Sequence, residues 1–597
     1  MQFRSVSEIF EQIESTSARL TITRLLAQLF KTLSPDELEK TIYLLQGRVV
    51  PLFEKEEFGM AEKSVVKCII KTFGLDSHEF RKTVQKVGDL GKAVEAHKSQ
   101  VLTLDVSSHE PSVLEVYNTL RLIAETGGTG SQEKKSVYLG NLLRQLDPRS
   151  CRYVVRIVLS TIRLGFSDMT ILDALSWMIT GDKRIRPQLL KGYQLRPDLG
   201  YIAKIVKQEG ENAVDDIAPT LFTPIIMMRA ERLNRADDII AQIGTCYIEP
   251  KYDGFRVQIH YAKKENKVRI YSRNLEDVTA MFPDIAEAVR NEVHVQSLII
   301  EGEAVGYNPH TKQLVAFQET VQRKRKYNIA DKAKELPLKI FVFELLFADG
   351  KSYLEVPFEK RRNILSTIIA PGESLEKKSV LLINDSFVSE APALESLFES
   401  AVGEGQEGII AKKSDGIYQP GARGWNWIKY KKQYTSVIQD TIDCLVMGYD
   451  AGKGKRTDFG LGAFLVGVYD KRNDMYVTVA KIGTGLSDKE WQELFKQCQP
   501  LRVGKKPMQY EVDKQMTVDQ WVTPQLVVEI RADEITKSSV HTAGRVLEPS
   551  KSGQSLKVKE PGFALRFPRL ERFRDDKSPP DITTVEELRK MTDAQLR

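Results

Sequence analysis

The spacing of apolar residues changes near residue 220, and this change sets which folds the chain can adopt. Before about residue 215, apolar residues recur every three or four positions, as in LTITRLLAQLFKTL and CRYVVRIVLSTIRLGF. This spacing is typical of helices that bury one face. Ser34 is followed by Pro35 and by Glu37, which predicts a helix that begins at Pro35 with Ser34 as its cap. The sequence therefore predicts an all-α domain over residues 1–215.

After this point the pattern is that of strands mixed with helices. The runs RVQIHYA, SLIIEGEAV and LKIFVFELLF are short, β-rich and partly alternating. Helical stretches such as FEKRRNILSTII separate them, which predicts an α+β domain over residues 216–434. Residues 435–597 add further strand-like runs and one helix, DKEWQELFKQ. An oligonucleotide-binding β-barrel (OB-fold) fits this number of elements, and a generic small barrel fits it too.

Charge and cysteine content narrow the classes of function. Lys and Arg number 87 against 81 for Asp and Glu, and the net charge of +6 permits a nucleic-acid partner without requiring one. The five cysteines lie far apart and form no C-x-x-C pair, which argues against a zinc site and a disulfide framework. No apolar run reaches the roughly 18–20 residues of a membrane span. The start MQFRSVSEIFEQIE is unlike a signal peptide and no long extension precedes the helical region, so we expect a cytoplasmic protein with no membrane partner.

The most chemically informative segment is EPKYDGFR, residues Glu249–Arg256. A lysine becomes a nucleophile when its amine loses its proton, which burial or neighbouring cations favour. The glycine permits a tight turn, and the arginine offers a planar fork for phosphate oxygens. Alone, K-x-D-G is weak evidence, because a chain of this length has on the order of a 0.1 chance of containing one at average composition. A surface β-turn with solvated charges is the alternative interpretation of this segment.

Six further motifs follow the lysine segment in order. They are YSRN (271–274), EGE (301–303), FEL (343–345), EGIIAK (407–412), WIKYK (427–431) and RDDK (574–577). In this order they resemble the motifs of the nucleotidyltransferase superfamily of DNA ligases, RNA ligases and mRNA capping enzymes. The R-x-D-K and stretches such as AGKGKRTDFGLGAFL (451–465) are similar to ATP-dependent DNA ligases of the archaeal and eukaryotic replicative type. The resemblance is dense from about residue 220 onward and looser before it, where RLGFSDMTILDAL (163–175) carries it.

The resemblance implies a nucleophile and a nucleotide-binding site. Lys251 would attack the α-phosphate of ATP and carry AMP as a phosphoramidate, which splits one difficult transfer into easier steps. The implied nucleotide contacts are Glu249 at the adenine amino group, Phe343 on the base, Glu303 at the ribose, Arg256, Arg273, Lys429 and Lys431 around the phosphates, and Arg574 and Lys577 at the pyrophosphate during the first step. Lys429 and Lys431 alternate with apolar and aromatic neighbours, so on a strand they share one face. Taken alone, Phe343 is equally well explained as a core residue.

Two acids resemble those that lie near the catalytic metal ion, namely Glu301 and Glu407. Carboxylates suit Mg²⁺, a hard cation that prefers oxygen ligands and keeps several waters. We therefore expect ATP and Mg²⁺ as cofactors, with Mn²⁺ able to substitute. Each acid alone is more often an ordinary surface residue, and only the order of the motifs supports the metal role.

The implied function is that of an ATP-dependent DNA ligase, a monomer that seals nicks in duplex DNA through a lysyl-AMP intermediate and a DNA-adenylate. Its roles would be DNA replication, repair, recombination and cell division. The all-α domain would bind DNA and the α+β domain would be the adenylation domain. An RNA ligase or capping guanylyltransferase shares the lysine motif, but the helical domain and R-x-D-K favour a DNA ligase. An NAD-dependent ligase would need zinc-binding cysteines, and a non-catalytic DNA-binding protein would not retain the acids and lysines of the motifs.

Three further segments are candidate contact surfaces. Lys453–Arg456 predicts a loop that follows DNA phosphates. Arg323–Lys326 also matches a nuclear-localisation pattern, but we expect a DNA-facing or solvated surface. The run QVLTL from Gln100 is a candidate for docking on a sliding clamp, with Leu102 and Leu104 in a hydrophobic groove. It lacks the aromatic residues that usually anchor such interfaces, and the alternative is that these residues pack against the helical domain.

Overall fold

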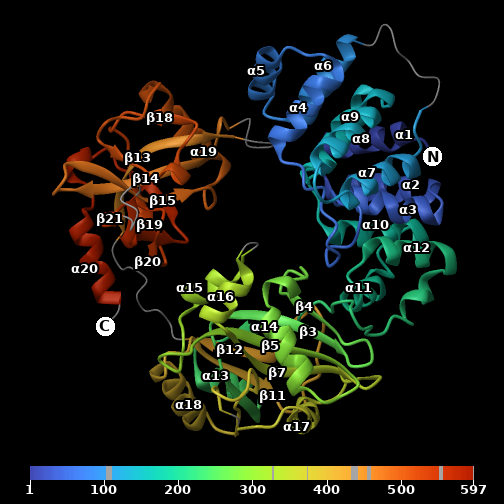
Figure 1. Ribbon diagram of the computed structural model, residues 1–597, viewed down its shortest axis with the longest axis vertical. Coiled ribbons are helices and arrows are strands. Elements are labelled where there is room, and N and C mark those ends of the chain that lie inside the picture. The colour runs from blue at the N-terminus through green and yellow to red at the C-terminus, as the bar shows by residue number, and fades with distance from the viewer. Residues whose placement is uncertain are drawn as a thin grey trace. The chain divides into compact units, whose positions relative to one another are not determined.

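The computed structural model describes residues 1–101, 110–325, 328–372, 374–431, 441–452, 459–549 and 556–595. Contacts divide the chain into two compact units. The first unit comprises Met1–Asp76 and Val94–Lys432, and the second comprises Ser77–Ala93 and Gln433–Arg597. Figure 1 shows helices in the amino-terminal part of the chain and mixed helices and strands in the rest. The predicted domain boundaries at residues 215 and 434 stay predictions.

The amino-terminal part of the first unit is helical, which confirms the predicted all-α fold of this region. Its third helix begins at Pro35, and Ser34 and Glu37 form the predicted capping box. The helices with residues in this part are α1 (Phe3–Glu14), α2 (Arg19–Thr32), α3 (Pro35–Leu45), α4 (Glu62–Phe73), α6 (Leu90–Val101), α7 (Val113–Glu125), α8 (Ser131–Gln145), α9 (Pro148–Val158), α10 (Asp168–Thr180), α11 (Arg186–Leu195) and α12 (Leu199–Glu209).

Buried charges join three of these helices. Arg156 of α9 donates to Glu14 of α1 at 2.8 Å, and Arg152 of α9 donates to Glu95 of α6 at 2.9 Å. Both arginine side chains are buried. Burial alone would raise the pKa of Glu14, but the hydrogen bond and charge of Arg156 outweigh burial and lower that pKa to about 2. This ion pair therefore stabilises the helical part only while Glu14 is ionised.

The rest of the first unit has the predicted α+β fold. Among the residues described, its strands form a five-stranded sheet in the order β1-β12-β11-β2-β10 and a seven-stranded sheet in the order β4-β3-β5-β7-β8, with β6 beside β5 and β9 beside β7. The strands are β1 (Arg229–Arg232), β2 (Cys246–Pro250), β3 (Phe255–Ala262), β4 (Lys267–Ser272), β5 (Ser297–Asn308), β6 (Gln313–Leu314), β7 (Leu338–Ala348), β8 (Lys351–Ser352), β9 (Val380–Leu382), β10 (Ser386–Val388), β11 (Gly408–Lys413) and β12 (Arg423–Lys431).

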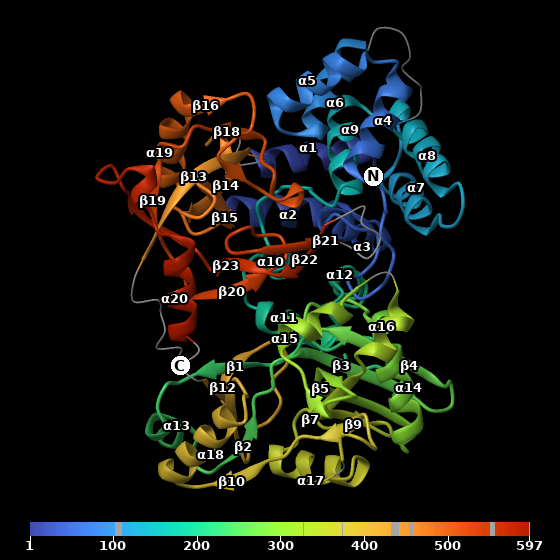
Figure 2. The ribbon, with the colours of Figure 1, turned by 60° about the vertical axis from the view of Figure 1, so that its left-hand side comes forward.

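Each sheet packs against helices of its own (Figure 2). On the five-stranded sheet, α13 and α18 bury Ile239 and Leu394 in one apolar core. On the seven-stranded sheet, α14 and α17 contribute Val289 and Leu365 to another. The helices of this part are α13 (Ala236–Ile243), α14 (Pro283–Glu292), α15 (Phe317–Thr320), α16 (Ile329–Glu335), α17 (Phe358–Ile368) and α18 (Ala391–Gly403).

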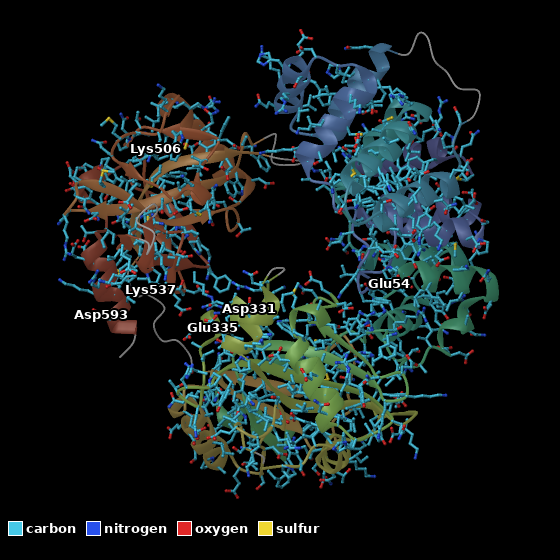
Figure 3. The ribbon with its side chains drawn as sticks, viewed as in Figure 1. Glu54, Asp331, Glu335, Lys506, Lys537 and Asp593 are labelled. Carbon is cyan, nitrogen blue, oxygen red and sulfur yellow. The ribbon has the colours of Figure 1, made fainter. Side chains whose placement is uncertain are left out.

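The second unit is rich in strands, and its sheets fit the predicted OB-fold. Within the described residues, β16-β18-β13-β14-β15-β17 form one sheet in this order, and β19 joins β13 to β24. Two further pairs, β20 with β23 and β21 with β22, lie outside that sheet. The predicted helix DKEWQELFKQ is α19, and Asp593 of α20 lies near Lys537 of β20 (Figure 3).

The bounds of the elements in the second unit are α5 (Ser77–Val87), β13 (Ile442–Ala451), β14 (Leu461–Asp470), β15 (Met475–Ile482), α19 (Asp488–Cys498), β16 (Arg502–Val503), β17 (Tyr510–Glu511), β18 (Gln520–Val522), β19 (Val527–Arg531), β20 (Glu534–Ser538), β21 (Val546–Pro549), β22 (Leu556–Glu560), β23 (Gly562–Arg566), β24 (Arg569–Phe573) and α20 (Val585–Gln595). Strands β13, β14 and β15 pair in an antiparallel manner. Their apolar side chains form the core of this unit together with α19 and α20.

The predicted DNA-facing or solvated surface at residues 323–326 is wrong for Arg323, and Lys326 lies outside the described residues. Its side chain is 1% exposed and donates to both carboxylate oxygens of Asp284 on α14, at 2.8 and 2.9 Å. It also donates to the carbonyl oxygen of Leu336 at 2.7 Å. A guanidinium so enclosed belongs to the core, whereas Lys324 and Arg325 are exposed.

The remaining sequence predictions concern cysteines, membranes and surface segments. All five cysteines are buried and free. None of the described helices is long and apolar enough to cross a membrane. The basic segment Lys453–Arg456 and the apolar residues Leu102 and Leu104 lie outside the described residues. Gln100 lies exposed in the last turn of α6.

Candidate active site

Lys251 lies immediately after β2, where two backbone hydrogen bonds join it to the start of β11. Its amide donates to the carbonyl oxygen of Gly408 at 2.8 Å, and its carbonyl oxygen accepts from the amide of Glu407 at 3.0 Å. The next residue, Tyr252, stacks on Phe341 of β7 with ring centroids 4.0 Å apart. The lysine is therefore fixed to both sheets rather than carried on a free surface turn.

Two glycines allow the close backbone approach at this point. Gly408 has φ of +143°, and a Cβ there would lie 2.2 Å from the carbonyl oxygen of Tyr430 on β12. At Gly254, a Cβ would lie 2.5 Å from the carbonyl oxygen of Ala304 on β5. A larger residue at either position would push apart the strands that hold the site.

The carboxylate of Glu407 joins Lys251 to β12. One of its oxygens accepts from the ammonium of Lys251 and the other from that of Lys431. The three side chains are between 18% and 27% exposed, so the cluster opens to solvent. Burial would raise the pKa of Glu407, but the charges of the two lysines outweigh it and lower that pKa. Glu407 therefore remains ionised between two cations.

Lys429 and Lys431 share one face of β12, as their alternation predicts. In the register of the sheet, Lys431 lies opposite Gly408 and Lys429 opposite Ile410. Burial and then the charges of neighbouring cations, among them Lys431 and Lys251, lower the pKa of Lys429. Such a concentration of positive charge beside one carboxylate suits a ligand with several phosphate groups.

Arg256 and Glu301 form a buried ion pair between β3 and β5. Arg256 donates to Glu301 at 2.7 Å and to the carbonyl oxygen of Met228 at 2.7 Å. Glu301 is 0% exposed and also accepts from Gln258 at 3.0 Å and from the hydroxyl of Tyr418 at 2.9 Å. The predicted role of Glu301 as a metal ligand does not fit this geometry, because its oxygens face three protein donors and no solvent. Its contacts instead hold Arg256.

Glu407, the other predicted metal ligand, is partly exposed, but both of its oxygens accept from lysine ammonium groups. Among the described residues, no three His, Cys, Asp or Glu side chains gather as a ready-made metal cluster. Mg²⁺ commonly keeps several waters and binds through one or two carboxylates together with substrate phosphates. A metal ion bound at Glu407 would replace at least one of these lysine contacts.

Glu303 and Arg273 lie on either side of Arg256 in the seven-stranded sheet. Glu303 of β5 pairs with Arg256 of β3. Burial raises the pKa of Glu303 to about 7, against the lowering effect of nearby cations. The carboxyl group is thus present in both protonation states near neutral pH. On the other side, Arg273 follows Ser272, which pairs with Val257 of β3, and Arg273 is exposed.

Glu249 and Lys412 form a second buried ion pair, and no role was predicted for Lys412, the last residue of the EGIIAK motif. The ammonium of Lys412 lies 2.8 Å from the carboxylate of Glu249 and donates to the carbonyl oxygen of Phe343 at 2.7 Å. The side chains of Lys412 and Glu249 are 1% and 2% exposed. Burial raises the pKa of Glu249 and lowers that of Lys412. Lys412 therefore fixes Glu249 beside Phe343 and links β11 to β7.

A further buried pair supports the same region. Glu344, next to Phe343, accepts from Arg361 of α17 at 2.8 and 2.9 Å, and both side chains are at most 1% exposed. The charge of Arg361 outweighs burial and lowers the pKa of Glu344. A usable sequence signal exists for Glu344, because it interrupts an apolar strand, whereas Lys412 is followed by Lys413 and gives no such signal. An isolated charge in such a strand needs a buried partner.

Arg574 and Lys577 belong to the second unit, whereas the other predicted site residues belong to the first. Both cations donate to the carboxylate of Asp443 at the start of β13. Arg574 also donates to both oxygens of Asp576 at 2.8 Å. The R-x-D-K motif is thus an ordered cluster of charges within its own unit.

Three family models match the chain. The model of the ATP dependent DNA ligase domain matches residues 227–431, that of the DNA ligase N terminus matches 2–176, and that of the ATP dependent DNA ligase C terminal region matches 457–577. A probable DNA ligase of Dictyoglomus thermophilum is 42% identical over 592 residues, which are 99% of this chain and 97% of the relative. A DNA ligase of Staphylothermus marinus is 38% identical over 612 residues, with 100% and 99% covered.

Among solved structures, Pmar-Lig_PreS3 is similar in fold, with a TM-score of 0.51 over 95% of this chain and 99% of that chain. Its sequence identity is 19%, so the likeness concerns the fold alone. The family models together match most of the chain, and the two relatives match it over its full length. The chain belongs to the ATP-dependent DNA ligases.

Proposed function

We propose that this ligase reacts with ATP through Lys251. The Lys251 nitrogen forms a bond to the α-phosphorus, the bond from that phosphorus to the pyrophosphate oxygen breaks, and the amine proton passes to solvent. The observation that carries the proposal is the contact of Lys251 with Glu407 beside Lys429 and Lys431. Phosphoryl transfer depends mainly on positioning and charge stabilisation, which this cluster supplies.

The surrounding residues are proposed to bind the nucleotide in a fixed orientation. Glu249 accepts from the adenine amino group, Phe343 stacks on the base, and Glu303 contacts the ribose. The phosphates lie among the positive side chains, namely Arg256, Arg273, Lys429 and Lys431. When bound, Mg²⁺ or Mn²⁺ neutralises phosphate charge, with Glu407 as the protein ligand. In support, Lys412 already holds Glu249 and the backbone of Phe343 together.

Two further steps complete the proposed reaction. AMP passes from Lys251 to the 5′-phosphate at a nick, and the 3′-hydroxyl then attacks that phosphate and expels AMP. The helical part and the second unit are proposed to bind the duplex through sequence-independent phosphate contacts. In this proposal the ligase is a cytoplasmic monomer that acts in DNA replication, repair and recombination, with a sliding clamp as a further partner through Gln100–Leu104.

Labelling with ATP that carries ³²P at the α-phosphate tests the nucleophile. We expect an acid-labile, alkali-stable label on the wild type and none on Lys251→Ala or Lys251→Arg, because arginine stays protonated and cannot attack. Lys413→Ala is the matched control, since this more exposed lysine pairs with Asp415 at 3.1 Å outside the cluster. Label on either Lys251 variant would refute the assignment. Parallel reactions with labelled GTP and NAD should give no adduct.

A further inference from the structure

In the second unit, one carboxylate holds both cations of the R-x-D-K motif. Asp443 is the second residue of β13, and its side chain is 10% exposed. One of its oxygens accepts from Arg574 at 2.8 Å, and the other accepts from Lys577. Two cations placed side by side repel each other, and a shared carboxylate removes that repulsion. Asp443 is therefore the contact that allows Arg574 and Lys577 to lie together.

The backbone fixes Asp443 before any ligand binds. Its amide donates to the hydroxyl of Thr583 at 3.0 Å, and its carbonyl oxygen accepts from the amide of Thr583 at 3.1 Å. Across the sheet, Asp443 pairs with Glu529 of β19. The amide of Arg574 donates to the carbonyl oxygen of Val527 on the same strand at 2.9 Å. These backbone contacts therefore fix the positions of Asp443 and Arg574 relative to each other.

Two other acids near Arg574 have different positions. Asp576 accepts from the far side of the guanidinium at 2.8 Å, but its side chain is 63% exposed. Glu529 lies 3.6 Å from Arg574, beyond hydrogen-bonding distance, and is bonded to Arg572 and Thr441. Asp443 is the one of these three acids that is both buried and shared with Lys577.

We propose that Asp443 is a positioning residue for the first step of the reaction, the transfer of AMP from ATP to Lys251. This inference rests on the proposed function of the R-x-D-K motif at the pyrophosphate. Asp443 uses one donor of Arg574 and one of Lys577, and Asp576 uses two more of Arg574. The donors that remain on the two cations are presented together to the leaving group. Without Asp443, the flexible side chain of Lys577 moves away from Arg574. The two cations then contact the leaving group independently instead of together.

The test uses the full-length protein and the nearly isosteric variant Asp443→Asn. The rate of lysyl-AMP formation is measured in a single turnover over a range of ATP concentrations, and sealing of a pre-adenylated nick is measured in parallel. We expect the maximal adenylation rate to fall about 10- to 100-fold, with sealing of the pre-adenylated nick within about 2-fold of wild type. Glu529→Gln removes a carboxylate of similar burial that hydrogen-bonds Arg572 and Thr441 instead of Arg574 and Lys577, and it should leave both rates unchanged.

A double variant separates positioning from folding. If Asp443 acts through Lys577, Asp443→Asn should add little to the loss caused by Lys577→Ala, because residues that act as a unit are not additive. The proposal would be overturned by faster adenylation in Asp443→Asn, by equal losses of Asp443→Asn in both assays, or by an equal loss in Glu529→Gln. Full additivity of Asp443→Asn and Lys577→Ala would also overturn it. A wild type that labels at a residue other than Lys251 would instead overturn the proposed function.

Discussion

Replacing Lys412 with methionine tests whether the pair with Glu249 is as buried as its geometry indicates. Methionine keeps the length of the chain but removes the charge and the donor. Glu249 then loses its partner 2.8 Å away, and the carbonyl oxygen of Phe343 loses a 2.7 Å hydrogen bond. Removing one member of a buried ion pair typically costs about 3–5 kcal/mol. We expect about 4 kcal/mol here, because proton uptake by Glu249 relieves part of the loss.

The assay is urea unfolding followed by tryptophan fluorescence, with the free energy of unfolding obtained from the midpoint and slope. Lys413→Met is the matched control, because the next lysine along β11 is 39% exposed in its pair with Asp415 and should lose less than about 1 kcal/mol. The double variant Lys412→Met, Glu249→Gln should recover about 2 kcal/mol of the loss, since it leaves no unpaired charge. A Lys412→Met protein as stable as the Lys413→Met protein would refute the reasoning.

Three further predictions follow from the two units. Replacing Arg574 and Lys577 with alanine should block adenylation yet leave the sealing of a pre-adenylated nick largely intact; equal loss in both assays would contradict a role confined to the first step. The pKa of Glu14 is about 2 in the folded protein against an ordinary 4.5, so its ionised form contributes roughly 3 kcal/mol to the free energy of unfolding above pH 4.5. This contribution is lost as the pH falls toward 2, and the urea midpoint of Glu14→Gln should therefore depend less on pH over this window than that of the wild type. Gly408→Ala should reduce lysyl-AMP formation at least about 100-fold, since its Cβ would meet a carbonyl oxygen of the facing strand at 2.2 Å; a wild-type rate of labelling would show that the strand can yield.

The sequence predicted the larger features of the fold well, because each of them leaves a local signal. The helix that begins at Pro35 was predicted from three residues, since capping depends on near neighbours. The common face of Lys429 and Lys431 follows from the two-residue period of a strand. The α+β character of the residues after 220 was predicted from runs of a few residues for the same reason.

What the sequence did not predict depends on partners far away along the chain. Lys412 pairs with a carboxylate 163 positions earlier, and no local pattern predicts that contact. Glu301 resembled a metal ligand, yet the register of β3 and β5 surrounds it with protein donors. Arg323 was predicted to belong to a basic surface, but it pairs with Asp284 of α14, 39 positions earlier in the chain. Asp443 likewise gains its role only when β13 brings it to the R-x-D-K motif.

The buried guanidinium of Arg323 has a consequence for the way this chain tolerates change. Three consecutive cations, Arg323, Lys324 and Arg325, look interchangeable by charge, but the first is held in the core and the next two face water. Substitution of Lys324 or Arg325 changes the charge of an exposed surface, where Lys324 lies 3.6 Å from Glu276. Substitution of Arg323 instead removes the ion-pair partner of Asp284. We therefore expect such a basic run to vary freely at its solvent-facing positions while the core arginine stays fixed. If all three residues are replaced together, the loss of Arg323 unfolds the protein. A DNA-binding assay would then record this unfolding as the loss of a DNA contact.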